Sequence, residues 1–141
     1  MTYDIFLTHA WRYHDDWNRF VSLLDGVEGF EWRNFSLPWY DPAFDPRTPV
    51  GERMVLKSLE AQIAPAHCCI VLASVFETRS ARQWVDLEIG IARRLGKPLL
   101  GAPPHNGTSL PAELEQLIDR VIPWEGAAAV RTIKEEVAKP R

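Results

Sequence analysis

One glutamate stands out among the residues that could do chemistry, because it interrupts the apolar face of a predicted helix. At about 100° per residue, residues 80–95 divide into a continuous apolar arc and an opposite polar arc. Glu88 falls near the middle of the apolar arc, one turn from Trp84 and one turn from Ala92. A carboxylate that faces a core is costly unless it is paired, protonated or open to a cavity. Glu88 is therefore a candidate catalytic carboxylate, and a structural carboxylate tied to an arginine or a backbone amide is the alternative.

Around this helix, predicted strands and predicted helices alternate along the chain. The strands are predicted over residues 3–8, 30–35, 68–74, 97–101 and 120–123. The helices are predicted over residues 14–25, 52–63, 80–95, 112–117 and 127–137. Such alternation implies a parallel sheet with right-handed crossovers. We therefore expect one α/β domain over residues 1–141, a flavodoxin-like three-layer sandwich whose five-stranded parallel sheet has the order 2-1-3-4-5.

This strand order predicts where a ligand binds. In such sheets the ligand lies beyond the carboxyl ends of strands 1 and 3, where the winding reverses. Side chains that follow these strands, or that begin the helix at 80–95, should face that cleft. They are His9, Ala10, Trp11, Ser74, Ser80 and Trp84. Ser80 is also placed to cap the helix at its amino end, and Gly96 is placed to end it.

Residues 36–50 form a predicted long loop, because their four prolines exclude a helix or an inner strand. Loops of about 15 residues are uncommon in compact domains and are often functional. Aromatic side chains in this loop, with Trp39 among them, lead us to expect a mobile lid over the cleft.

Several classes of protein are excluded by composition and by missing motifs. The net charge of −3 gives no basic face for nucleic acid. We see no signal peptide and no apolar stretch of about 18 residues, so we expect a cytoplasmic protein without a membrane span. Cys68 and Cys69 lie in an apolar run and indicate buried thiols in a reducing compartment, and their spacing does not suit zinc. The chain has no P-loop and no GxGxxG, and it lacks the phosphate loop of flavodoxins and the acidic residues of receiver domains.

Several short motifs, in their order and spacing, resemble the TIR-like domain family. The opening DIFLTHAW, residues 4–11, is similar to the FISHSW start of these domains, with Thr8 where a serine is common. NFSLP, residues 34–38, resembles the N-x-S-x-P entry to their BB loop. SARQWVDLEIGIA, residues 80–92, followed by GKP, is similar to their S-x-W-x-x-x-E-x-x-x-A helix and the strand after it, although three residues here separate the serine from the tryptophan. Among these domains, the resemblance is to the TIR-like proteins of bacterial Thoeris anti-phage systems.

The resemblance implies an enzyme of the NAD nucleosidase and ADP-ribosyl cyclase type, with Glu88 as its catalytic residue. NAD is then the substrate, and neither a metal nor a bound cofactor is expected. The product would be a cyclic or conjugated ADP-ribose nucleotide, a signal that a separate effector protein reads in anti-phage defence. Together with the expected cleft, the resemblance implies these substrate-binding residues: Thr8, His9, Ala10, Trp11, Asn34, Ser36, Trp39, Ser74, Ser80 and Trp84.

Two other functions remain open. Many TIR domains are non-catalytic interaction modules that self-associate through the BB loop. Nucleoside deoxyribosyltransferases have a related fold and also use a carboxylate at a glycosidic carbon. A buried Glu88 favours either enzyme over the interaction module, and the serine–tryptophan–glutamate order favours the TIR-like enzyme over the transferase.

Overall fold

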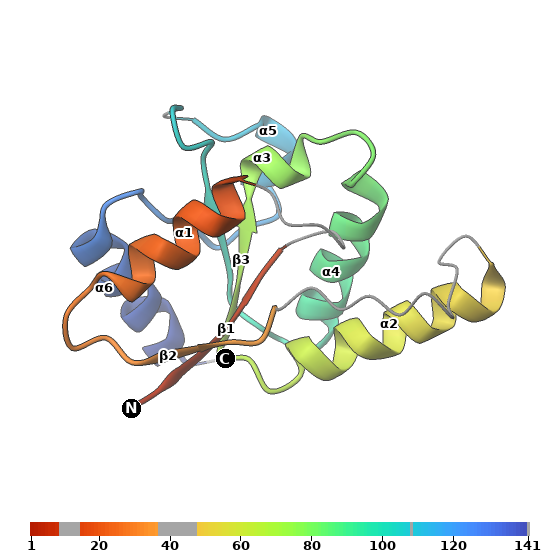
Figure 1. Cartoon of the computed structure of the whole chain (residues 1–141), viewed down its shortest axis with the longest axis horizontal. Helices are drawn as coiled ribbons and strands as arrows, with labels where there is room; N and C mark the ends of the chain where they lie inside the picture. Colours follow the sequence, from red (N-terminus) through yellow and green to blue (C-terminus); the bar gives the residue numbers. More distant parts are fainter. Residues whose placement is uncertain (9–14, 37–47, 108, 141) are drawn as a thin grey trace.

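The computed structural model describes residues 1–8, 15–36, 48–107 and 109–140. Within these residues, the strands form a five-stranded parallel sheet in the order β2-β1-β3-β4-β5 (Figure 1). The strands are β1 (Tyr3–Leu7), β2 (Trp32–Asn34), β3 (Cys68–Leu72), β4 (Leu99–Ala102) and β5 (Arg120–Val121). The predicted fold class and strand order are confirmed, because each crossover contains a helical segment that returns the chain to the same end of the sheet.

Helices cover both faces of this sheet. They are α1 (Asp15–Asp25), α2 (Pro49–Ile63), α3 (Ala73–Phe76), α4 (Arg82–Arg94), α5 (Ala112–Glu115) and α6 (Gly126–Ala138). Figure 1 shows α1 and α6 together on one face and α2 and α4 together on the other, in agreement with their contacts. In the described part of the chain, no helix has the length and apolar character that crossing a membrane requires.

The core is centred on β1 and β3. Every residue of β3 is buried, and so are Ile5, Phe6 and Leu7 of β1. A parallel strand covered by helices on both faces needs a continuous apolar sequence, which is the pattern that residues 68–72 have. Cys68 and Cys69 are free and buried, as the sequence predicts.

The third strand is shorter than its apolar run predicts. The run indicates a strand over residues 68–74, whereas β3 ends at Leu72, which pairs with Ala102 at the end of β4. Beyond the last pairing partner, the backbone bonds to itself and forms α3. The Glu77 N–H donates to the Ala73 carbonyl at 2.8 Å.

The start of α4 also differs from the prediction. Ser80 is exposed and lies in a turn, so the prediction that it caps the helix is wrong. Ala81 is the residue at the cap, and it makes no side-chain capping bond. The helix begins at Arg82, two residues after its predicted start, and the Ala81 carbonyl accepts its first bonds, from the N–H groups of Trp84 and Val85 at 3.0 and 3.1 Å.

Two other helix ends have clear chemical causes. α2 begins at Pro49, three residues before the predicted start, because Thr48 caps it and accepts the Gly51 N–H at 3.0 Å. Proline is favoured at the first position of a helix, where no N–H is needed. At the other end of α4, Gly96 has φ of 70°, the left-handed conformation that commonly ends helices. The prediction that Gly96 ends this helix is confirmed.

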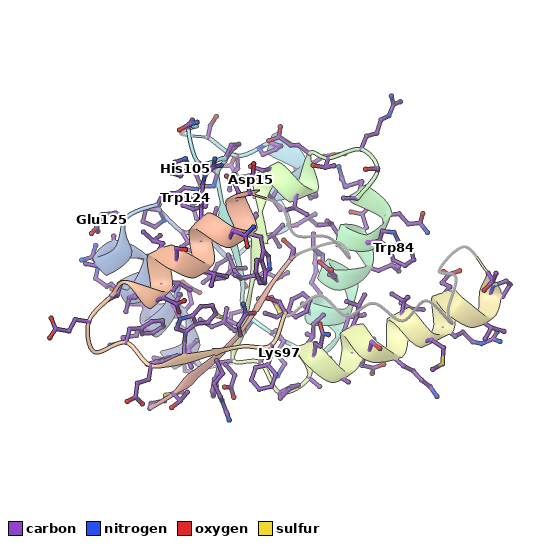
Figure 2. All side chains as sticks on the ribbon, in the orientation of Figure 1. Asp15, Trp84, Lys97, His105, Trp124 and Glu125 are labelled. Atoms are coloured by element: carbon purple, nitrogen blue, oxygen red, sulfur yellow. The ribbon has the colours of Figure 1, made fainter. Side chains whose placement is uncertain are left out.

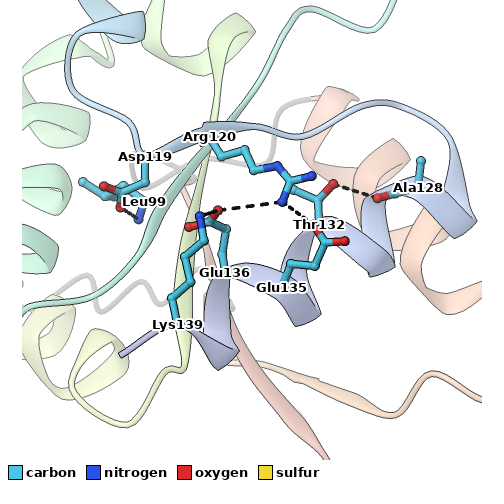
Figure 3. Close-up of polar contacts among 8 residues, drawn as sticks. All are labelled: Leu99, Asp119, Arg120, Ala128, Thr132, Glu135, Glu136 and Lys139. Carbon is cyan, nitrogen blue, oxygen red and sulfur yellow. Dashed lines mark hydrogen bonds and ion pairs between the residues drawn. The ribbon is translucent and has the colours of Figure 1, made fainter. Parts of the chain in front are cut away.

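Polar contacts at the edge strand join β5 and α6 (Figure 3). Arg120 forms an ion pair with Glu135 at 2.5 Å, which lowers the pKa of that carboxyl. Glu136 is buried and accepts a bond from Lys139 at 2.6 Å. Asp119 accepts the Leu99 N–H at 2.8 Å and donates its own N–H back to Leu99 at 2.7 Å. These contacts hold the edge strand and its helix at the amino end of the sheet, away from the expected cleft.

Candidate functional site

Glu88 is buried in the layer between α4 and the sheet. Only 2% of the residue is exposed, and its neighbours on the same helix face, Val85, Ile89 and Ala92, are buried too. The apolar arc predicted from the sequence therefore faces the core, with the carboxylate inside it.

The Glu88 carboxylate acts electrostatically on the Cys69 thiol of β3. Burial raises the pKa of the Cys69 thiol well above its usual range, and the nearby Cys68 and Glu88 raise it further. Lys97 opposes this effect. Glu88 thus lies on the buried face of α4, where its charge favours the protonated form of the Cys69 thiol.

The start of α4 is braced by Arg82. Its guanidinium lies 3.7 Å from the centroid of the Phe76 ring on α3. This is a cation–π contact, in which the face of the ring attracts the positive charge. The guanidinium also pairs with Asp86 and with Glu113 of α5, each at 2.9 Å, and the bond to Asp86 is the main cause of its raised pKa. The same turn of α4 carries Trp84, which is half-buried and lies one turn before Glu88. These contacts fix the direction in which α4 leaves the carboxyl end of the sheet.

Thr8 lies at the point where the winding of the sheet reverses. It is buried, and its hydroxyl accepts the Leu72 N–H at 3.1 Å. Its own N–H donates to the Ile70 carbonyl at 2.9 Å. The side chain therefore joins the carboxyl ends of β1 and β3, beside the expected cleft.

Asn34 and Ser36 form a local turn where β2 ends. The Asn34 side-chain oxygen accepts the Ser36 N–H at 2.9 Å and also the Ser36 hydroxyl. Such bonds from an asparagine to the residue two positions later are typical of turns. Ser36 is fully buried, so it fixes the chain as it leaves the sheet.

Ser74 lies on α3 at the carboxyl end of the sheet, and its hydroxyl donates to the carboxylate of Asp16. Asp16, in the first turn of α1, is only 3% exposed. It also accepts the backbone N–H of His105 at 3.2 Å and forms an ion pair with Arg19 at 2.8 Å. Figure 2 shows His105 near the amino end of α1, on the opposite side of the molecule from Trp84.

A pocket of about 470 Å³ opens beside this cluster, between α1, α3 and the loop after β4. Its walls include Arg19, Ser74, Glu77, His105 and Asn106. Asp16 and His105 are absent from the residues that the sequence singled out. Asp16 did carry a signal, because it lies four and eight residues before Phe20 and Leu24 and so shares their buried stripe.

The described residues of the predicted site lie on several different elements. Thr8 and Ser74 lie at the carboxyl ends of β1 and β3, and Trp84 and Glu88 lie on the helix that follows. Asn34 and Ser36 lie where β2 ends, and Ser80 lies in the turn before α4. His9, Ala10, Trp11 and Trp39 lie outside the described residues, as does most of the predicted lid.

Comparison with known proteins places this arrangement in a family. Among solved structures, the chain is similar to a Clostridium botulinum CMP N-glycosidase, BcmB, at 13% identity and a TM-score of 0.48, over 93% of this chain and 98% of that one. At this level the likeness says nothing about the activity of this chain. No curated protein matches the sequence. The family model described as "Thoeris protein ThsB, TIR-like domain" matches residues 6–109, which include the end of β1, all of β2, β3 and β4, and Glu88. The chain therefore belongs to the ThsB TIR-like domain family.

Proposed function

We propose that this protein cleaves NAD at the nicotinamide–ribose bond, with Glu88 as the catalytic carboxylate. The ADP-ribose part would then be joined into a cyclic or conjugated nucleotide. Membership of the Thoeris family supports a role for that nucleotide as a signal in anti-phage defence, read by a separate effector protein.

The observation that carries the proposal is the position of Glu88. The residue is 2% exposed on the apolar face of α4, where an ordinary core residue would be leucine or isoleucine. Keeping a carboxylate in such a place is costly, so functional sites are a frequent reason for it. The family's catalytic glutamate is expected at this same position of the motif.

The chemistry suits a carboxylate held in a largely dry site. Loss of nicotinamide leaves positive charge on the ribose, as in the oxocarbenium-like transition state of glycoside cleavage. A fixed negative charge stabilises that cation more strongly where water is excluded. Trp84, one turn earlier on α4, offers an aromatic surface for the nicotinamide ring.

The proposal is tested by incubating the purified protein with NAD and resolving the products by chromatography and mass spectrometry. We expect free nicotinamide together with ADP-ribose or a cyclic or conjugated form of it. If the mass balance shows only intact NAD, with or without extract from phage-infected cells, the protein is not an NAD-cleaving enzyme. A non-catalytic module that self-associates through the BB loop would then be the better account.

A further inference from the structure

We propose that the pocket between α1, α3 and the loop after β4 binds a ribosyl group. Ser74 accepts a hydrogen bond from a hydroxyl of that group, and Asp16 is the positioning residue that holds Ser74 for this role. The ligand class rests on the proposed function, because NAD and ADP-ribose both present ribose hydroxyls.

The Asp16 carboxylate is buried and is held in place by three hydrogen bonds. One carboxylate oxygen accepts the Ser74 hydroxyl and the His105 N–H at 3.2 Å, and the other accepts from Arg19 at 2.8 Å. These donors come from α3, from the loop after β4 and from α1. Bonds to an ionised carboxylate are stronger than bonds between neutral groups, and only 3% of this residue is exposed. The three segments that form the pocket are therefore held together by a single side chain.

This geometry determines the hydrogen-bonding polarity of Ser74. A serine hydroxyl has one proton to donate and two lone pairs that accept. The Ser74 proton is committed to Asp16, so the oxygen that faces the pocket can only accept. Donation to a carboxylate also makes this oxygen a better acceptor, because linked hydrogen bonds polarise one another. A ligand at this position must bring an O–H or N–H group.

The rest of the pocket suits a phosphorylated sugar. Glu77 adds a second acceptor beside Ser74, while Arg19, whose side chain is 49% exposed, offers a cation. A volume of about 470 Å³ is within the range of small-molecule sites. A ribose 5-phosphate unit would place its hydroxyls toward Ser74 and Glu77 and its phosphate toward Arg19.

The test is a pair of NMR titrations, with ribose 5-phosphate and with inorganic phosphate, in which the amide signals of His105 and Asn106 report binding. We expect the wild type to bind ribose 5-phosphate more tightly than phosphate. Ser74→Ala should weaken ribose 5-phosphate by about fivefold to tenfold, the effect of one lost hydrogen bond, and should leave phosphate unchanged. Asp16→Ala should act in the same direction, because it releases the Ser74 proton.

Two further variants separate positioning from general stability. Asp16→Asn should retain most of the selectivity, because the amide oxygen can still accept from Ser74 and His105 while Arg19 turns to water. Asp119→Asn changes another carboxylate that accepts a backbone N–H, at the amino end of the sheet, and should not alter the binding of either ligand.

The proposal is overturned if the wild type binds ribose 5-phosphate no better than phosphate, or if Ser74→Ala leaves the selectivity intact. Equal losses in Asp119→Asn and Asp16→Ala would also overturn it. None of these results depends on NAD cleavage. If the protein selects ribose 5-phosphate but cleaves no NAD, the ribosyl site stands and the proposed function fails. If it cleaves NAD but does not select ribose 5-phosphate, the proposed function stands and the ribosyl site fails.

Discussion

At the carboxyl end of β1, the Thr8 hydroxyl stabilises the fold, and it is also a candidate for substrate binding. It accepts the buried Leu72 N–H at 3.1 Å. Thr8→Val keeps the shape but leaves that N–H without its acceptor, so we expect a loss of about 1–3 kcal/mol in the free energy of unfolding by urea. Thr8→Ser keeps the hydroxyl and should lose much less. If the two variants lose equally, the methyl group rather than the hydrogen bond is what stabilises this point.

The two buried carboxylates show what a sequence can reveal about single residues. Helical periodicity placed Glu88 on the buried face of its helix, and the structure confirms that position. The same periodicity places Asp16 on the buried face of α1. An aspartate in the first turn is also common on surface helices, however, because its charge interacts favourably with the helix dipole. The bond between Asp16 and Ser74 joins residues 58 positions apart, and no local pattern indicates such a contact.

At the scale of elements, one glycine lies within α4 and another follows its end. Replacing each by alanine should change the free energy of unfolding in opposite directions. Gly96 has φ of 70°, so Gly96→Ala forces a side chain into the left-handed region and should cost about 1 kcal/mol. Gly90 is exposed within the helix, and nothing lies within 4 Å of the position an added Cβ would take. Gly90→Ala should therefore stabilise the protein by about 0.5–1 kcal/mol. Urea unfolding of both variants checks the signs, and a shared sign would contradict this account of the helix.

Gly101 makes β4 a strand that packs closely against the segment before β5. An added Cβ would lie 2.7 Å from Cδ1 of Ile118, so Gly101→Ala should destabilise the protein by about 1–3 kcal/mol. Ile118→Val removes that carbon, so the double variant should recover part of the loss. Thermal melts of the single and double variants measure the coupling. Strictly additive effects would show that the contact with Ile118 is not the cause.

The ends of the elements were harder to predict than their existence. The start of α2 follows from Thr48 and Pro49, a cap and a first-turn proline that the sequence displays. The end of β3 depends instead on where β4 stops pairing with it, and the start of α4 depends on a turn in which Ser80 makes no capping bond. The first of these ends is set by a strand distant in the sequence, and the second by a local turn that the serine does not reveal.

At the scale of the whole molecule, the strand order could be predicted because strands and helices alternate, and right-handed crossovers leave few arrangements. The sheet separates two polar centres, with Glu88 on the side of α4 and Asp16 on the side of α1. Which side chains meet across the cleft could not be predicted, because the strand order fixes the position of each element but not its side-chain contacts.

The buried thiol of the central strand makes the stability of the whole fold depend on pH. Burial raises the pKa of Cys69 well above its usual range, whereas the thiol of the unfolded chain titrates near pH 8.5. Above about pH 8.5 the unfolded state releases a proton that the folded state keeps, so stability falls as the pH rises. Urea unfolding between pH 7 and 10 should show a shallower decline for Cys69→Ala than for the wild type. Parallel declines would contradict the burial of an un-ionised thiol.

The most direct test of the central claim is nicotinamide release from NAD by the wild type, Glu88→Gln and Glu60→Gln, measured together with their thermal melts. Glu88→Gln keeps the shape but removes the charge, so turnover should fall by about a hundredfold or more. Its melting temperature should hold or rise, because glutamine keeps the shape and the hydrogen bonding of the side chain and removes the cost of burying a charge. Glu60→Gln removes an equal charge from the surface of α2 and should match the wild type. A Glu88→Gln protein that loses several kcal/mol of stability but keeps its turnover per folded molecule would contradict the catalytic role of Glu88.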